Sequence, residues 1–306
     1  MTSPVVRCLK QQVQDAEIHF LVKKQFIDTI KNNPYIDKIH TFDGNLKKTI
    51  EELKKENFDH IIDLHKNLRS IRIRNKLKVP DLTFNKLNIE KWFAVKLKRK
   101  ALLPDVHIVD RYFEAVAPFD VKNDGKGLDY FINPETDKIK LPYEKYIVFV
   151  IGAKHATKQI PPEIAVKILS KVKHPVILLG GKEEIATSEK ITQGLKDKEI
   201  TNLTGKLTLN QSAYVISQSA GVITPDTGLM HIASAFKKPI ASVWGNTIPE
   251  FGMYPYKPDS RSKIFEVKDL KCRPCSKLGY KKCPKGHFNC MMKQDTDAIA
   301  AFANSL

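Results

Sequence analysis

The sequence is poor in tryptophan and has no long apolar run. Only 2 of its 306 residues are Trp, and no basic motif is interleaved with aromatic side chains as in RNA-binding surfaces, which weighs against a nucleic-acid partner. No stretch approaches the ~18 consecutive apolar residues that a membrane-spanning helix needs. The N-terminus also lacks the basic start and apolar core of a secretory signal. We therefore expect a cytoplasmic protein with no nucleic-acid partner.

Acidic residues are also scarce. The chain has 51 Lys and Arg against 34 Asp and Glu, a formal net charge of +17. From Lys66 to Lys100 there are twelve basic residues against only Asp81 and Glu90, a net charge of +10. Such a field attracts polyanions, which are nucleic acid, an anionic membrane face or a phosphorylated substrate. An anionic acceptor at a membrane surface fits best, and solvated helix faces in a Lys-rich chain are the plain alternative.

The length and the pattern of the chain indicate two α/β domains. With 42% hydrophobic and 28% charged residues, the chain has a globular composition and is long enough for two cores. Short β-rich runs alternate with helical patterns in both halves, which predicts parallel sheets with helices on their faces. The polar stretch 133–137 separates the halves. We expect two Rossmann-like domains, at 1–135 and 136–306.

The expected elements follow this alternation. In the first half the pattern predicts strands at 17–22, 38–41 and 60–64 and helices at 25–32 and 46–56. In the second half it predicts strands at 146–151, 176–179, 221–224 and 240–243, a helix at 209–218 and another from about residue 228. Residues 2–10 already have a helical pattern with Pro4 in the first turn. No strand precedes them, although a doubly wound domain usually begins with one.

The most informative segment follows the strand at 221–224. Pro225, Asp226, Thr227 and Gly228 lead into a helical run, so backbone N–H groups at the start of that helix, together with the Thr227 hydroxyl, form a site suited to a diphosphate. His231, one turn into the helix, can donate to a phosphate oxygen. The alternative is a helix capped by Asp226 with His231 in the core.

The residues that continue this segment resemble glycosyltransferase family 9, the heptosyltransferases that use ADP-heptose. The run 226–235, then Lys238-Pro239, then the sequence GNTIP at 245–249 are similar to the family signature. Further similar segments come in the expected order: 63–70, 109–112, Gly152-Ala153 with Thr157-Lys158, and the C-terminal cysteines. The resemblance extends from Thr2 to beyond Cys290. It implies an α/β fold of the GT-B type, with a cleft between two Rossmann-like domains.

The resemblance also implies the residues that bind the donor. Lys158 and His231 would stabilise the departing diphosphate, and the phosphates and nearby sugar would contact Asp226, Thr227, Gly228 and Leu229. Met230 would pack against adenine. Glu183, after the strand at 176–179, is placed to accept hydrogen bonds from ribose hydroxyls, although Glu184 is not separable from it, and a carboxylate at a helix start is the alternative. No metal or other cofactor is implied.

On the acceptor side, relatives bind a phosphorylated, acidic molecule. His65, Lys66, Arg69 and Arg72, with Arg74, follow a strand end within the basic segment, and a cationic loop there suits such an acceptor. The expected partners are therefore an ADP-sugar donor and the anionic lipopolysaccharide core. We also expect peripheral contact with the cytoplasmic face of the inner membrane.

The implied reaction is transfer of heptose from ADP-heptose to the lipopolysaccharide inner core, with inversion at the anomeric carbon. An acceptor hydroxyl, deprotonated by a carboxylate base, attacks while the nucleotide diphosphate departs. In the family an Asp in a Gly-Asp loop after the first strand is the expected base, and here that strand and loop are absent before Thr2. Either the start codon has been assigned too late, or the chain is truncated and inactive. A sugar-nucleotide or glycolipid binding protein without transferase activity is the alternative function.

Four cysteines form a further pattern. Cys272, Cys275, Cys283 and Cys290, with His287 among them, have spacings that a structural zinc ion could use. Disulfides are disfavoured in a reducing cytoplasm. The spacing is not that of a standard zinc ribbon or finger, so we expect no metal there.

Overall fold

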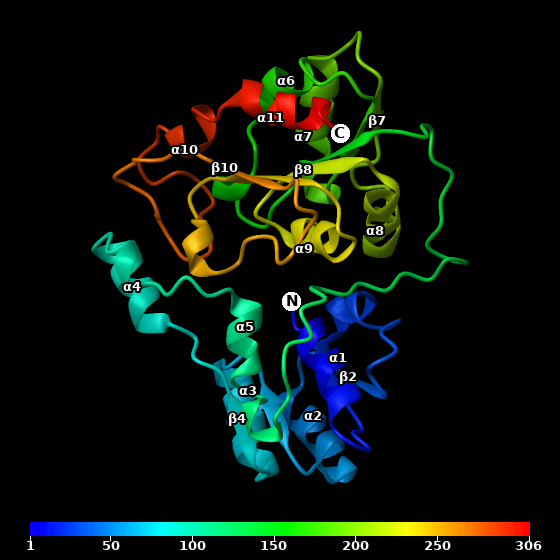
Figure 1. Cartoon of the computed structure of the whole chain (residues 1–306), viewed down its shortest axis with the longest axis vertical. Coiled ribbons are helices and arrows are strands. Elements are labelled where there is room, and N and C mark those ends of the chain that lie inside the picture. Colours follow the sequence, from blue (N-terminus) through cyan, green and yellow to red (C-terminus); the bar gives the residue numbers. More distant parts are fainter. The chain divides into compact units, whose positions relative to one another are not determined.

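The computed structural model describes all 306 residues, and their contacts divide them into two compact units (Figure 1). Unit 1 contains residues 1–87 and 106–131, and unit 2 contains residues 88–105 and 132–306. The chain therefore enters unit 2, returns to unit 1 and enters unit 2 again. A single boundary at residue 135 does not describe the excursion of residues 88–105.

Unit 2 is built on a six-stranded parallel sheet. Its strands lie in the order β10-β9-β8-β5-β6-β7. Their bounds are β5 Ile147–Val150, β6 Val176–Leu179, β7 Ile200–Asn202, β8 Gly221–Pro225, β9 Ile240–Trp244 and β10 Lys263–Glu266. Strands β5, β6, β8 and β9 are buried along their whole length. Uninterrupted apolar runs are typical of parallel strands that have helices on both faces.

Helices cover both faces of this sheet. Figure 1 shows α6, α7 and α11 on one side and α8 and α9 on the other. Their bounds are α6 Pro162–Leu169, α7 Ile185–Gln193, α8 Leu209–Gln218, α9 Gly228–Ala235 and α11 Thr296–Asn304. Fully buried Phe149, Ile164 and Leu178 lie in the main core, and Ile299 joins them from α11. The C-terminal helix therefore completes the core of unit 2.

Unit 1 contains two separate pairs of parallel strands. Strand β1 (His19–Lys23) pairs with β2 (Lys38–Phe42), and β3 (Ile61–Asp63) pairs with β4 (Asp81–Thr83). No strand joins the two pairs. In unit 2 the first strand, β5, holds that joining position between β6 and β8.

Helices and one buried cation complete unit 1. Its helices are α1 Ser3–Gln12, α2 Leu46–Leu53, α3 Leu68–Leu77 and α5 Ile108–Phe113. The buried guanidinium of Arg7 on α1 forms ion pairs with Asp124 and Asp129, and the hydrogen bond from Arg7 lowers the pKa of Asp124 to about 2. These contacts fasten the first helix to the last segment of the unit.

Most expected elements are present, with shifted ends. The helix expected at 25–32 is instead a 3-10 helix at Lys24–Thr29, and the one expected at 46–56 is α2 followed by a 3-10 turn at Lys54–Glu56. The remaining helices are α4 Asn88–Lys96 and α10 Asn289–Met292. None of the helices combines the length and apolarity needed to cross a bilayer.

Candidate active site

The strand order of unit 2 defines where a ligand would bind. Strands β6 and β7 lie on one side of β5, while β8, β9 and β10 lie on the other. The direction in which successive strands are added to the sheet therefore reverses between β5 and β8. Open parallel sheets bind ligands at this switch point, outside the carboxyl ends of the strands. The loop after β5 carries Gly152 and Lys158, and the loop after β8 carries Asp226 and Thr227. The topology therefore brings the predicted donor residues to one edge of the sheet.

Lys158 and Asp226 form an ion pair at this edge. The Lys158 Nζ lies 2.5 Å from Asp226 Oδ2, and both side chains are largely buried. The Thr247 hydroxyl, in the loop after β9, donates to the same carboxylate oxygen over 2.9 Å. Asp226 is thus occupied by a cation and a hydroxyl of the protein. Because a carboxylate repels a diphosphate, direct contact between Asp226 and the donor phosphates is unfavourable. The ion pair instead indicates that Asp226 holds Lys158 in place.

The start of α9 is open to an anion. Thr227 is the N-cap residue, but its side chain makes no capping hydrogen bond to the helix. First-turn N–H groups that no side chain caps are available to a negatively charged ligand. A Cβ added to Gly228 would meet no atom within 4 Å. The glycine therefore leaves space immediately in front of the helix.

Of three neighbours on α9, two are accessible and one is not. Leu229 is partly exposed and His231 lies on the first turn, partly exposed, where a phosphate at the helix start would be near. Met230, in contrast, is fully buried. In this structure the Met230 side chain therefore offers no accessible surface for the predicted packing against adenine. Met230 and Ala233 lie three positions apart in the sequence, so a helix places both on the same buried face.

A second buried carboxylate lies beside the loop after β5 and belongs to Glu184. Its side chain is buried, accepts a hydrogen bond from the Gly181 N–H over 2.7 Å and approaches the loop after β5. A Cβ on Gly152 would lie 2.6 Å from the Glu184 carboxyl carbon, so only glycine allows this approach. Glu183, the residue chosen from the sequence, is exposed. The short 3-10 turn at Lys182–Glu184 decides which of the two carboxylates faces the loop.

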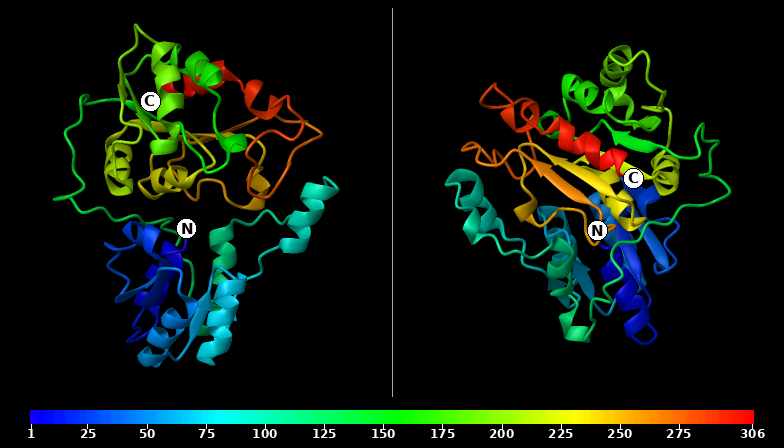
Figure 2. Two further views of the ribbon diagram at one scale, coloured as in Figure 1. Left: turned by 180° about the vertical axis from the view of Figure 1, so that it is seen from behind. Right: turned by 45° about the horizontal axis from the view of Figure 1, so that its top comes forward.

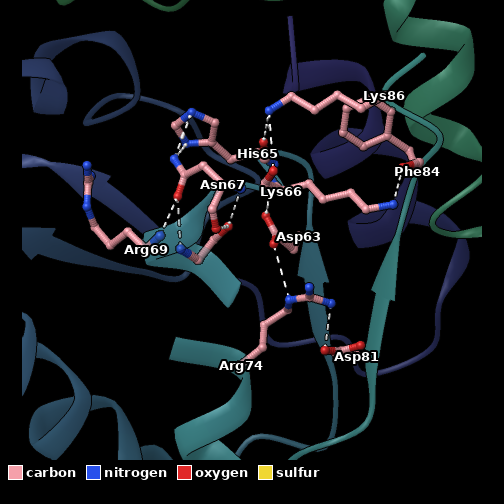
Figure 3. Close-up of polar contacts among 10 residues, drawn as sticks. Asp63, His65, Lys66, Asn67, Arg69, Arg74, Asp81, Phe84 and Lys86 are labelled. Carbon is pink, nitrogen blue, oxygen red and sulfur yellow. Dashed lines mark hydrogen bonds and ion pairs between the residues drawn. The ribbon is translucent and has the colours of Figure 1, made fainter. Parts of the chain in front are cut away.

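A tightly hydrogen-bonded loop follows β3 in unit 1 (Figure 3). Asp63 Oδ1 accepts the backbone N–H groups of His65 at 2.9 Å and Lys66 at 2.7 Å, and its other oxygen lies 3.2 Å from Arg74 Nε. Asn67 caps α3 through a capping box with Ser70. Buried Asp63 thus fixes the loop. Arg74 pairs with both Asp63 and Asp81, so its guanidinium is occupied within the protein.

Arg69 and Arg72 line one cavity of about 440 Å³. The other walls are Phe42, Leu46, Asn67 and Leu68. The Arg69 guanidinium carbon lies 4.5 Å from the centre of the Phe42 ring, a cation–π contact that orients it. The cavity therefore combines two cations with an apolar wall.

The other two predicted acceptor residues do not line this cavity. Figure 3 shows the Lys66 side chain pointing away from Arg69, and its ammonium donates to the Phe84 carbonyl over 3.3 Å. His65 contacts the Asn67 amide over 3.1 Å. Burial, together with nearby Lys86, lowers the pKa of His65. The imidazole is therefore neutral at neutral pH.

Two groups of side chains offer metal ligands outside these sites. In unit 1, ligand atoms of His19, His40 and Glu56 all lie within 4.8 Å of one another, although Lys38 also pairs with Glu56 at 2.7 Å. In unit 2 all the cysteines are free, and Cys272 Sγ lies 4.0 Å from His287 Nε2. Burial raises the pKa of Cys275 to about 11 and that of Cys290 to about 12. A metal would have to displace both thiol protons.

The order of strands gives unit 2 the doubly wound class, and the uncapped start of α9 lies at the edge of the sheet where this class binds ligands. The model of glycosyltransferase family 9 (heptosyltransferase) matches residues 46–284. The chain belongs to this family and is therefore a glycosyltransferase.

Similar proteins extend over most of the chain. Lipopolysaccharide heptosyltransferase 1 of Campylobacter coli is 24% identical over 270 residues, which are 79% of this chain and 79% of the relative. Lipopolysaccharide heptosyltransferase 3 of Escherichia coli strain K12 is 24% identical over 274 residues, or 81% and 79%.

The fold is that of the GT-B heptosyltransferases. A family 9 glycosyltransferase from Veillonella parvula superposes with a TM-score of 0.76 at 17% identity, covering 99% of this chain and 92% of that one. The E. coli heptosyltransferase WaaC with ADP gives a TM-score of 0.67 at 16% identity, covering 99% and 94%. The predicted family and fold class are confirmed.

Proposed function

We propose that the chain transfers heptose, or a closely related sugar, from an ADP-sugar to the lipopolysaccharide inner core, with inversion at the anomeric carbon. The observation that carries the proposal is the Lys158–Asp226 pair beside the uncapped start of α9, at the switch point of the sheet. This arrangement offers a cation, backbone N–H groups and open space where a diphosphate would lie. ADP is bound by the structurally similar WaaC, which supports an ADP-sugar as donor.

In the proposed reaction, an acceptor hydroxyl gives its proton to a base and its oxygen forms a bond to the anomeric carbon. The bond between that carbon and the diphosphate oxygen breaks on the opposite face. Lys158, the first-turn N–H groups of α9 and His231 stabilise the negative charge that develops on the diphosphate. Asp226 acts as a positioning residue for Lys158. Buried Glu184 replaces Glu183 as the proposed partner of the ribose hydroxyls. We assign no residue of this chain as the base.

On the acceptor side we propose the cavity at Arg69 and Arg72 as the binding site for a phosphate or carboxylate of the acceptor. Arginine matches the planar geometry of such groups, and Phe42 already orients Arg69. His65 is a weaker candidate because its ring is neutral. The ammonium of Lys66 is engaged with the Phe84 carbonyl, so we propose that Lys66 supports the loop.

A second candidate function is binding of the sugar nucleotide without transfer. The occupied carboxylates of the donor site favour it, because Asp226 is paired with Lys158 and Glu184 accepts the Gly181 N–H, so neither is free to act as a base. Calorimetry with ADP and a transfer assay with ADP-heptose and lipopolysaccharide core distinguish the two. Transfer that falls in Lys158→Ala and Thr227→Ala supports the transferase; ADP binding without any transfer supports the binding protein; absence of ADP binding refutes both.

A further inference from the structure

Large hydrophobic side chains are exposed together on one part of unit 2. The residues concerned belong to 88–105, which contains α4, and to 271–285, the cysteine-containing loop. Together we call these two segments the α4 surface. They contain half of the twelve large hydrophobic residues that are exposed in the whole chain: Ile89, Trp92, Leu97, Leu102, Leu278 and Tyr280. Ile89 is 70% exposed and Leu278 65%. A concentration of this kind marks an interaction site, whereas single exposed apolar residues do not.

The two segments form one surface because they are fastened to each other. The Lys277 ammonium donates to the Asn88 carbonyl over 3.1 Å, and the Lys98 ammonium donates to the Pro274 carbonyl over 2.7 Å. The inner face of α4 is occupied as well, since buried Ala94 packs against Ile248 and Phe251. The opposite face of α4, with Ile89 and Trp92, is exposed. Figures 1 and 2 show α4 at the outer edge of its unit.

The same surface is strongly cationic. Residues 88–105 contain five Lys or Arg and two acidic residues, and residues 271–285 contain six Lys or Arg and no acidic residue. The eleven basic residues, of which only Arg273 is buried, thus exceed the acidic ones by nine. Lys96 and Arg99 on the α4 segment and Lys281 and Lys282 on the loop are exposed. Apolar and cationic side chains therefore alternate on the same surface.

We propose that the α4 surface binds the face of an anionic lipid bilayer. Ile89 and Trp92 are separated by three positions and project from the same side of the helix, while Lys96 follows one turn later. Where exposed apolar side chains and cations lie together at a bilayer surface, the apolar side chains insert among the headgroups and the cations meet lipid phosphates. A tryptophan at this depth is characteristic of membrane interfaces. A purely apolar protein partner would not need nine excess positive charges.

The inference rests on the proposed function only for the biological role of membrane binding, since a lipid-linked acceptor is found at a membrane. Its physical basis, apolar exposure combined with charge, is independent of ADP or sugar. The lipid-binding surface also involves none of the residues assigned to the donor site. Membrane binding and sugar transfer can therefore fail separately.

The test uses the full chain and its two tryptophans. Trp244 is buried and Trp92 is exposed, so a change in emission on adding vesicles reports on Trp92. Vesicles of phosphatidylethanolamine and phosphatidylglycerol are compared with vesicles of phosphatidylcholine alone, by sedimentation and by acrylamide quenching. We expect binding to the anionic vesicles that weakens with salt, a blue shift of the emission and protection of Trp92 from acrylamide.

Variants separate the two components of the surface. Ile89→Ser and the double variant Lys96→Glu/Arg99→Glu should each weaken partitioning at least about tenfold. The matched controls are Ile264→Ser on β10 and Lys190→Glu/Lys196→Glu, with Lys190 on α7 and Lys196 after its end. All are exposed positions of the same unit, and these variants should bind as the wild type does. ADP binding, measured by calorimetry, should be the same in every variant, which also verifies folding.

Three results would overturn the proposal. One is equal binding to neutral and anionic vesicles. Another is an equal loss of vesicle binding in the control variants, because the effect would then depend on total charge or total apolar surface and not on the α4 surface. The third is wild-type binding with no protection of Trp92, which would show that some other surface meets the lipid. If the wild-type chain binds the anionic vesicles but transfers no sugar, that result would instead contradict the proposed function alone.

Discussion

Replacing Asp226 by Asn separates a positioning role from direct contact with the donor. In the free protein the carboxylate holds the Lys158 ammonium at 2.5 Å and accepts the Thr247 hydroxyl. Asn keeps the shape and an acceptor oxygen but removes the charge. Breaking a fully buried ion pair by removing one partner costs about 3–5 kcal/mol. Because the Lys158 side chain is 16% exposed, we expect a smaller loss, about 2 kcal/mol of unfolding free energy.

The effects on stability and on ADP affinity should differ in sign. A loss of about 2 kcal/mol corresponds to a fall in Tm of roughly 4–8 °C for a unit of this size. ADP should bind Asp226→Asn as tightly as the wild type or more tightly, because a negative charge near the diphosphate has gone while Lys158 is released. Lys158→Ala, in contrast, removes a charge-assisted hydrogen bond and should weaken ADP roughly 10- to 100-fold.

Calorimetry with ADP and thermal unfolding with and without ADP measure both quantities. The double variant Lys158→Ala/Asp226→Asn completes the cycle. Its loss of unfolding free energy should be smaller than the sum of the two single losses, because the two residues interact directly. Transfer should still fall in Asp226→Asn, because a released ammonium can bind the diphosphate of ADP but is not held where negative charge develops in the transition state. If Asp226→Asn weakens ADP as much as Lys158→Ala does, Asp226 contacts the donor and the positioning role is refuted.

Three further predictions address the open space, the acceptor cavity and pH. Gly228→Leu should abolish ADP binding while changing Tm little, because a Cβ there meets no protein atom; a large fall in Tm would show that the space is needed by the fold. Arg69→Ala and Arg72→Ala should each raise the acceptor KM about tenfold or more, with kcat and ADP affinity unchanged, whereas Lys66→Ala should have a smaller effect; steady-state kinetics that rank Lys66 first would contradict the cavity. Since the pKa of His65 is lowered, its ring gains charge only as the pH falls below that value, so acidification should lower the acceptor KM of the wild type relative to His65→Gln; parallel pH profiles would exclude His65 from acceptor binding.

The sequence predicted those elements best whose signals are local. Strand β6 is a wholly apolar run, and the start of α8 is marked by Thr208 and Gln211, which form a capping box. Both elements have the bounds expected from the sequence. The segment at 25–32 has a helical pattern, but only a 3-10 helix at Lys24–Thr29 forms. A pattern of apolar residues does not distinguish such a turn from a short α-helix.

Long-range contacts account for what the sequence did not predict. Residues 88–105 belong to unit 2 because Ala94 packs against Ile248 and Phe251, more than 150 residues away in the chain. The role of Thr247 depends likewise on a contact with Asp226 across two strands. The choice between Glu183 and Glu184 depends on the direction of a single turn. Only the burial of Met230 had a usable signal, because it shares a helix face with Ala233.

The position of the diphosphate in a crystal of the chain with ADP tests the central claim most directly. We predict that the phosphates lie at the start of α9, within hydrogen-bonding distance of the backbone N–H groups of Thr227 or Gly228 and of the Lys158 ammonium. The ribose should face Glu184. A diphosphate bound away from the carboxyl ends of β5 and β8 would contradict the claim.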